Sequence, residues 1–98
     1  MTENKVNLSI QIIPKSPEGN TYELVDKAID EIKKSGVEYR VCPFETVMEG
    51  TYNELISVAG KAQEACFNAG AEEVLVFIKI QRRKNIDVTI DEKMKLYD

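Results

Sequence analysis

Apolar and polar residues alternate along residues 5–13, which predicts a strand that is buried on one face only. One phase of the alternation is apolar, and it consists of Val6, Leu8, Ile10 and Ile12. The opposite phase is mostly polar, and it consists of Asn7, Ser9, Gln11 and Ile13. We expect the strand to stop before Pro14, because proline cannot donate a hydrogen bond to a sheet ladder.

Two later stretches carry apolar residues at helical spacing and predict two helices. The first begins at Asn20 and ends at Gly36, and the second begins at Thr51 and ends at Gly70. Both starts have the spacing of a capping box, with a glutamate three positions after the first residue. The expected buried stripes are Val25, Ala28, Ile29 and Ile32 in the first helix and Leu55, Val58, Ala59, Ala62 and Cys66 in the second.

Three more strands are expected over residues 37–42, 46–51 and 73–81, followed by a helical turn over 91–96 with Asp91 as its cap. This β-α-β-β-α-β order predicts one ferredoxin-like α+β domain spanning residues 1–98. Its antiparallel sheet has strand one between strands three and four. Two helices cover only one sheet face, so the other, the open face, must meet water, a ligand or another subunit.

Continuing the alternation along each strand assigns five polar residues to the open face. They are Ser9, Gln11, Arg40, Glu49 and Lys79. The pattern alone favours a solvated face crossed by salt bridges. The same face also receives Val47, Leu75 and Phe77, and such a mixed patch is more typical of an interface or a pocket.

Charge and cysteine content narrow the classes of function. Thirteen basic and 17 acidic residues give a net charge of −4, which argues against nucleic-acid binding. There is no apolar run of the ~20 residues that cross a bilayer, and no export signal, so we expect a cytoplasmic protein without a membrane partner. Cys42 and Cys66 lie 24 positions apart without a C-x-x-C motif, so neither a disulfide nor a metal site is expected.

The chain contains no histidine, which removes the Ser-His-Asp arrangement, the H-E-x-x-H metal helix and the commonest proton-transfer side chain. The glycines form neither G-x-G-x-x-G nor a phosphate-binding loop. We therefore expect a protein that is not an enzyme and that has no cofactor.

The stretch "PFETVMEG", residues 43–50, holds a polar pair in an apolar frame. The pair is Thr46 and Glu49, and the frame is Phe44, Val47 and Met48. From the residues alone, the pair either holds a ligand or caps and closes a turn.

Several stretches together resemble the UPF0045 family of thiamine-binding-like proteins, from about Asn7 to Lys95. They are "IIPK", "SGVEYRVCPFETVMEG", "NAGAEEVLVFIKIQRR" and "DEKMK". The most specific element is the threonine-x-x-glutamate-glycine turn after a proline, here Thr46, Glu49 and Gly50. Glu45 departs from the small residue that usually precedes this threonine.

The resemblance implies a ferredoxin-like subunit that forms dimers or dimers of dimers and binds thiamine or its hydroxymethylpyrimidine part without catalysis. The expected ligand residues are Thr46, Glu49, Ser9, Gln11, Phe44 and Lys79. An aminopyrimidine offers an amine donor beside ring-nitrogen acceptors, which carboxylate, hydroxyl and amide groups can match. The alternative is an interaction module whose sheet face makes only subunit contacts.

Overall fold

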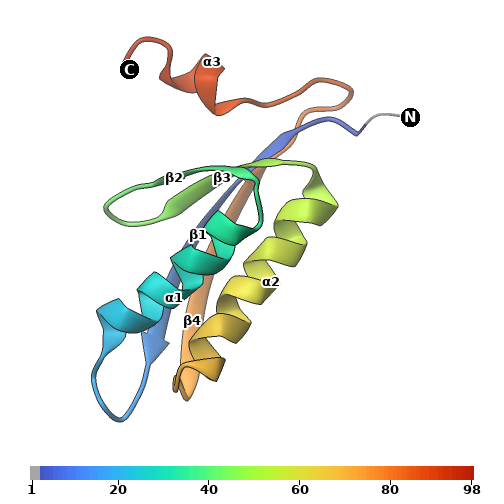
Figure 1. The fold of residues 1–98 in the computed structure, drawn as a ribbon. Coiled ribbons are helices and arrows are strands. Elements are labelled where there is room, and N and C mark those ends of the chain that lie inside the picture. The colour runs from blue at the N-terminus through green and yellow to red at the C-terminus, as the bar shows by residue number, and fades with distance from the viewer. Residues whose placement is uncertain (1–2) are drawn as a thin grey trace.

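A computed structural model describes residues 3–98 as a four-stranded antiparallel sheet with two long helices on one face (Figure 1). The elements are β1 (Val6–Lys15), α1 (Thr21–Lys34), β2 (Glu38–Val41), β3 (Thr46–Gly50), α2 (Tyr52–Asn68), β4 (Glu73–Gln81) and α3 (Ile90–Met94). The strand order is β2-β3-β1-β4, with β1 between β3 and β4 as predicted. The ferredoxin-like βαββαβ fold expected from the sequence is confirmed.

The core lies between the sheet and the helices, and strand alternation decides which residues enter it. Val6, Leu8 and Ile10 of β1 are buried toward the helices, beside Met48 of β3. In α2 the whole predicted stripe is buried, from Leu55 to Cys66. In α1 the buried residues are Leu24, Ala28 and Ile32, whereas the predicted Val25 and Ile29 are only half-buried.

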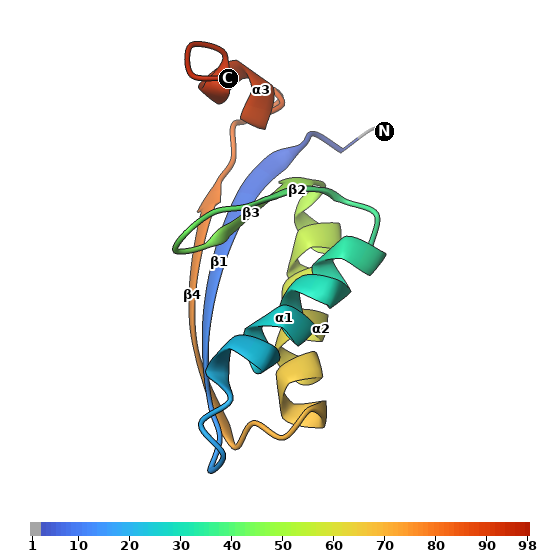
Figure 2. The same ribbon diagram turned by 60° about the vertical axis from the view of Figure 1, so that its left-hand side comes forward.

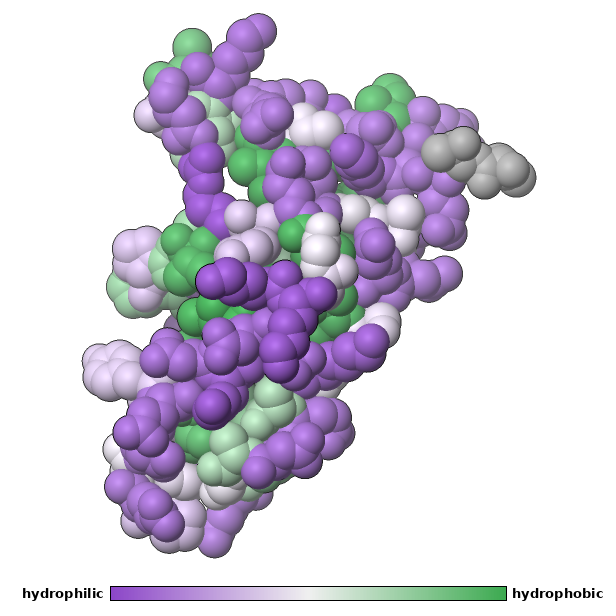
Figure 3. All heavy atoms as spheres, viewed as in Figure 1, coloured by the Kyte–Doolittle hydropathy of each residue, from purple (hydrophilic) through white to green (hydrophobic). Residues whose placement is uncertain are grey.

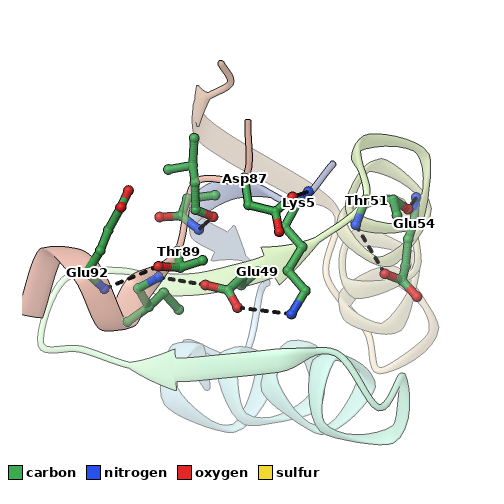
Figure 4. A network of polar contacts seen from close by, with 10 residues as sticks. Lys5, Glu49, Thr51, Glu54, Asp87, Thr89 and Glu92 are labelled. Carbon is green, nitrogen blue, oxygen red and sulfur yellow. Dashed lines mark hydrogen bonds and ion pairs between the residues drawn. The ribbon is translucent and has the colours of Figure 1, made fainter. Parts of the chain in front are cut away.

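The two predicted capping boxes differ in outcome. At α2 the box forms, because Thr51 Oγ1 accepts from Glu54 N at 3.4 Å and Glu54 Oε1 accepts from Thr51 N at 3.3 Å (Figure 4). At α1 the prediction was wrong, since Asn20 makes no side-chain cap. Its Oδ1 accepts instead from the hydroxyl of Ser16, four residues earlier, so a local competitor takes the capping atom.

Strand β1 does not stop at Pro14, as the sequence had indicated, but continues to Lys15. Pro14 pairs with Val74 of β4, whereas β3 pairs with β1 only from Val6 to Ile10. Beyond Ile10, β1 is therefore an edge on its β3 side. Proline is tolerated at edge positions, because a missing N–H there breaks no ladder.

The C-terminal segment after β4 turns back over one end of the sheet (Figures 1 and 2). Its helix α3 begins at Ile90, and its cap is Thr89, whose Oγ1 accepts from Glu92 N at 3.2 Å. The predicted cap, Asp91, was wrong by two positions. Thr89 has the extended backbone that a capping residue needs, and Asp91 already lies inside the helix.

In Figure 2 the two long helices lie on one side of the sheet, and α3 lies beyond its end. The surface seen in Figure 3, on the side of α1 and α2, is largely hydrophilic. None of the helices within residues 3–98 combines the length and the apolar character that a membrane crossing demands.

Candidate functional site

One row of side chains crosses all four strands on the open face of the sheet. The registers pair Arg40 of β2 with Val47 of β3, Val47 with Ser9 of β1, and Ser9 with Lys79 of β4. The row therefore places a hydroxyl and an apolar side chain between two cations. This is the open-face grouping of Ser9, Arg40 and Lys79 that strand alternation had predicted.

The next row toward the C-terminal segment is Glu38, Glu49, Asn7 and Gln81, again one residue from each strand. Glu38 and Glu49 are direct cross-strand neighbours. The pKa of Glu38 is raised, because its carboxyl shares a hydrogen bond with that of Glu49 and because the two negative charges repel each other. The register of β2 and β3 therefore holds two carboxyl groups close together in this row.

Glu49 holds the start of α3 against the sheet. Its side chain is almost fully buried, and its Oε1 accepts from Ile90 N at 2.6 Å. Its Oε2 lies 3.9 Å from Lys5 Nζ, so the carboxylate also faces a cation. Figure 4 shows Glu49 between Lys5 and the first turn of α3. The carboxylate meets the N-terminal end of a helix, where exposed N–H groups favour a negative charge.

Asn7 on the neighbouring strand β1 also holds the C-terminal segment, and one of its side-chain atoms has no hydrogen-bond partner within residues 3–98. Its Nδ2 donates to Val88 O at 3.1 Å. The backbone of Lys5 adds a second tie, since Val88 N donates to Lys5 O at 3.0 Å. Asn7 is only 5% exposed, and its Oδ1 is buried without a hydrogen-bond partner among residues 3–98. A buried acceptor of this kind is costly unless a ligand or water meets it.

A cavity of about 390 Å³ lies between the open face and α3, and we call it the α3 cavity. Its floor is formed by Asn7, Ser9, Arg40, Val47, Lys79 and Gln81. The β2–β3 hairpin contributes Cys42 and Glu45, and the C-terminal segment contributes Ile90, Lys93 and Met94. The volume falls within the ~300–1,000 Å³ range of small-molecule sites.

Two ion pairs border the α3 cavity. Lys79 Nζ lies 3.3 Å from Glu45 Oε1, which joins β4 to the hairpin across the open face. Arg40 pairs with the side chain of Asp98, which ties β2 to the C-terminal residue. This pairing lowers the pKa of Asp98 and raises that of Arg40. All four groups retain contact with solvent, so these pairs are weak and can exchange partners.

The six predicted ligand residues fall into three places. Ser9 and Lys79 line the α3 cavity. Gln11, Phe44 and Thr46 line a smaller cavity of about 100 Å³ between α1 and the β2–β3 hairpin. Glu49 lines neither, because its carboxylate is engaged with Ile90.

Thr46 and Glu49 do not converge on one site. They are three residues apart on β3, so their side chains point to opposite sheet faces. Whether any of the six residues contacts a ligand stays a prediction.

Sequence reasoning missed Asn7 and the whole contribution of α3 to the α3 cavity. Asn7 shares the strand phase of Ser9, so alternation was a usable signal for it. Lys93 and Met94 could not be found in this way, because the local sequence of the C-terminal segment does not indicate which part of the protein it packs against.

Within residues 3–98, no group of three or more potential ligands could hold a metal ion. Both cysteines are free, Cys42 half-buried and Cys66 buried.

Comparison with known proteins shows which family this chain is similar to. A family model described as "Thiamine-binding protein" matches residues 8–98. A UPF0045 protein of Clostridium perfringens is 42% identical over 91 residues, which cover 93% of this chain and 95% of that protein. A UPF0045 protein of Methanocaldococcus jannaschii is 30% identical over 91 residues, which cover 93% of this chain and 90% of that protein.

Solved structures agree with the sequence comparison. A Bacillus cereus domain of unknown function superimposes with a TM-score of 0.94 at 43% identity, covering 97% of this chain and 91% of that one. A candidate thiamine biosynthesis or salvage protein of Thermotoga maritima gives a TM-score of 0.86 at 28% identity, covering 96% and 99%. Sequence and structure thus agree over nearly the whole chain, which belongs to the thiamine-binding protein family that includes the UPF0045 proteins.

Proposed function

We propose that this protein binds thiamine or a related aminopyrimidine, such as hydroxymethylpyrimidine, in the α3 cavity and that it does so without catalysis. The observation that carries the proposal is the α3 cavity itself, whose wall combines polar side chains such as Asn7 and Ser9 with apolar ones. Membership of the thiamine-binding protein family and the thiamine-related description of the Thermotoga maritima structure support the choice of ligand.

The wall offers the groups that an aminopyrimidine requires. The exocyclic amine is a donor, and Asn7 Oδ1, which is buried without a partner among residues 3–98, can accept from it once the side chain turns toward the cavity. The Ser9 hydroxyl can donate to a ring nitrogen, because it lies on the same face of β1 two residues away. Val47 and Met94 supply apolar contact for the ring, and methionine sulfur packs well against aromatic rings.

The predicted ligand residues contribute unequally to this proposal. Ser9 and Lys79 are retained as direct contacts because they line the α3 cavity. Glu49 acts indirectly, by holding Ile90 and thereby the α3 wall. Gln11, Phe44 and Thr46 border a cavity well below the volume range of ligand sites, so we assign them no contact.

Calorimetric titration with thiamine and hydroxymethylpyrimidine tests the proposal. Ser9→Ala removes one neutral hydrogen-bond partner and is expected to weaken binding about fivefold, equivalent to roughly 1 kcal/mol. Asn7→Ala is expected to weaken it further. The matched control is Asn53→Ala, since Asn53 is exposed on α2 and does not line the cavity. Absence of binding by the folded wild-type protein contradicts the proposal.

We also propose that the uncovered part of the open face joins copies of the chain into a homo-oligomer. On β4, Leu75 is 46% exposed and Phe77 is 54% exposed. They pair with Ile13 and Gln11 of β1, away from the rows that α3 reaches. Exposed apolar neighbours on a sheet are typical of an interface. Oligomers that bind no aminopyrimidine would favour the alternative function, an interaction module. The cytoplasmic location stays a prediction.

A further inference from the structure

The charges around the α3 cavity have the opposite sign from those of the protein as a whole. The protein carries a net charge of −4. Four charged residues line the cavity, and three are cations: Arg40, Lys79 and Lys93, against Glu45 as the one anion. A concave site with an excess of one sign of charge concentrates ligands of the other sign. An acidic protein that gathers cations at one cavity thus favours an anionic ligand there.

The three cations approach the cavity from three different elements. Arg40 on β2 and Lys79 on β4 stand at the two ends of the row that contains Val47 and Ser9. Three strand spacings separate them, about 14 Å between backbones, which two long side chains can bridge toward a central group. Lys93 joins them from α3. A compact polyanion near Ser9 would therefore lie among all three.

The present partners of these cations leave them available. Lys79 is paired with Glu45 and Arg40 with Asp98, and exposed pairs of this kind are worth little in water. Within residues 3–98, Lys93 has no carboxylate within 4.0 Å. A phosphate group accepts charge-assisted hydrogen bonds from lysine and arginine and can compete with single carboxylates.

We propose that the preferred ligand of the α3 cavity is a phosphate ester of the aminopyrimidine, recognised by Lys93, Lys79 and Arg40. The inference rests on the proposed function, since it places the pyrimidine at Asn7 as described above. Lys79 is the cross-strand neighbour of Ser9, so a ring that contacts Asn7 and Ser9 has a cation beside it for its phosphate. The cationic wall also disfavours the fixed positive charge of an unphosphorylated thiazolium.

The test is calorimetry with two matched pairs of ligands: hydroxymethylpyrimidine and its phosphate, and thiamine and its monophosphate. Within each pair the phosphorylated form is expected to bind roughly tenfold more tightly, as a charge-assisted hydrogen bond permits. Raising the salt concentration should shrink this ratio, because salt screens exposed charges. Binding of the unphosphorylated forms should depend much less on salt.

The variants are Lys93→Gln and its matched control Lys95→Gln, which removes the same charge two residues away and outside the cavity wall. Lys93→Gln is expected to lower affinity for the phosphorylated ligands about three- to fivefold and not to lower affinity for the unphosphorylated ones. Lys95→Gln should change neither.

The outcomes separate the two proposals. Equal or weaker binding of the phosphorylated ligands, with clear binding of the unphosphorylated ones, overturns the phosphate inference and leaves the proposed function standing. Equal losses in Lys93→Gln and Lys95→Gln also overturn the inference, since they indicate a general charge effect. If none of the four ligands binds, the proposed function itself is wrong.

Discussion

The carboxylate of Glu49 accepts a hydrogen bond from the backbone N–H of Ile90 at 2.6 Å, and this contact joins β3 to the first turn of α3. The two residues are 41 positions apart in the chain. Together with the contacts of Asn7 and Lys5 to Val88, it holds one wall of the α3 cavity over the sheet. The shape of the cavity therefore depends on a carboxylate that does not line it.

Glu49→Ala should loosen α3, because it leaves the buried Ile90 N–H without a partner. We expect a loss of about 1–3 kcal/mol of unfolding free energy, measured by denaturant titration. Amide hydrogen exchange should accelerate from Ile90 to Met94 more than in β1. The control is Glu64→Ala, which removes an exposed carboxylate on α2 that makes no hydrogen bond to α3. Unchanged exchange in Glu49→Ala would show that α3 is held by other contacts.

Glu49→Gln separates that structural role from the direct ligand contact predicted from the sequence. The amide oxygen of glutamine can still accept from Ile90, so α3 should stay docked. Because Glu49 does not line the α3 cavity, we expect thiamine affinity to change less than about threefold. A loss of about 10- to 150-fold with α3 still protected from exchange would instead support a charge-assisted contact between Glu49 and the ligand.

Glu38→Gln should make the protein more stable at neutral pH but not at acidic pH. The pKa of Glu38 is raised from its ordinary value of 4.5, so protonated Glu38 is favoured in the folded state. Below pH 4.5 the wild type has the full benefit of this protonation, and the benefit is lost as the pH rises through the raised pKa. Glutamine cannot ionise, so the variant avoids that loss.

Thermal unfolding of Glu38→Gln and wild type across this pH range measures the difference. We expect a small difference, because Glu38 is solvent-exposed and its charge is screened. A gain that is as large at pH 3 as at pH 7 would assign the effect to something other than ionisation of Glu38.

Leu75 and Phe77 provide the test of assembly. We expect wild type to sediment as an oligomer at micromolar concentration, and Leu75→Glu with Phe77→Glu to give a monomer, because two buried charges would oppose the contact. Phe67→Glu is the matched control, since Phe67 is 41% exposed but lies on α2, on the helix side of the sheet. A wild-type mass of about 11 kDa, that of one chain, would rule out this interface.

The two cysteines should react very differently with a thiol reagent. Cys42 is half-buried and lines the α3 cavity. Cys66 is fully buried, its Sγ contacts the carbonyl oxygen of Leu24 at 3.4 Å, and burial raises its pKa. Mass spectrometry of the native protein should therefore show one labelled thiol, and of the unfolded protein two.

A bound ligand in the α3 cavity should slow the labelling of Cys42, which gives an independent readout of where thiamine binds. Cys42→Ser should leave oligomeric state and ligand affinity nearly unchanged, because serine is similar in size to cysteine and the sequence indicates neither a disulfide nor a metal site for Cys42. Rapid labelling of native Cys66 would contradict the packing of α2 against α1.

Local patterns in the sequence determined most of the fold. Alternation in β1 and the helical stripe in α2 report burial on one side of an element, and neighbouring residues alone decide that periodicity. The capping box of Thr51 and Glu54 was predictable for the same reason. Where a local rule failed, another local interaction replaced the expected one. Asn20 accepts a hydrogen bond from the Ser16 hydroxyl instead of capping α1.

The site depended on contacts that no local pattern contains. Alternation placed Ser9, Arg40 and Lys79 on one face, but only the strand registers put them in one row. The path of the C-terminal segment decided the rest, because α3 closes the cavity through contacts between residues 41 and 81 positions apart. Such contacts depend on how the whole chain packs, so the role of Glu49 and the free acceptor of Asn7 emerged only from the tertiary structure.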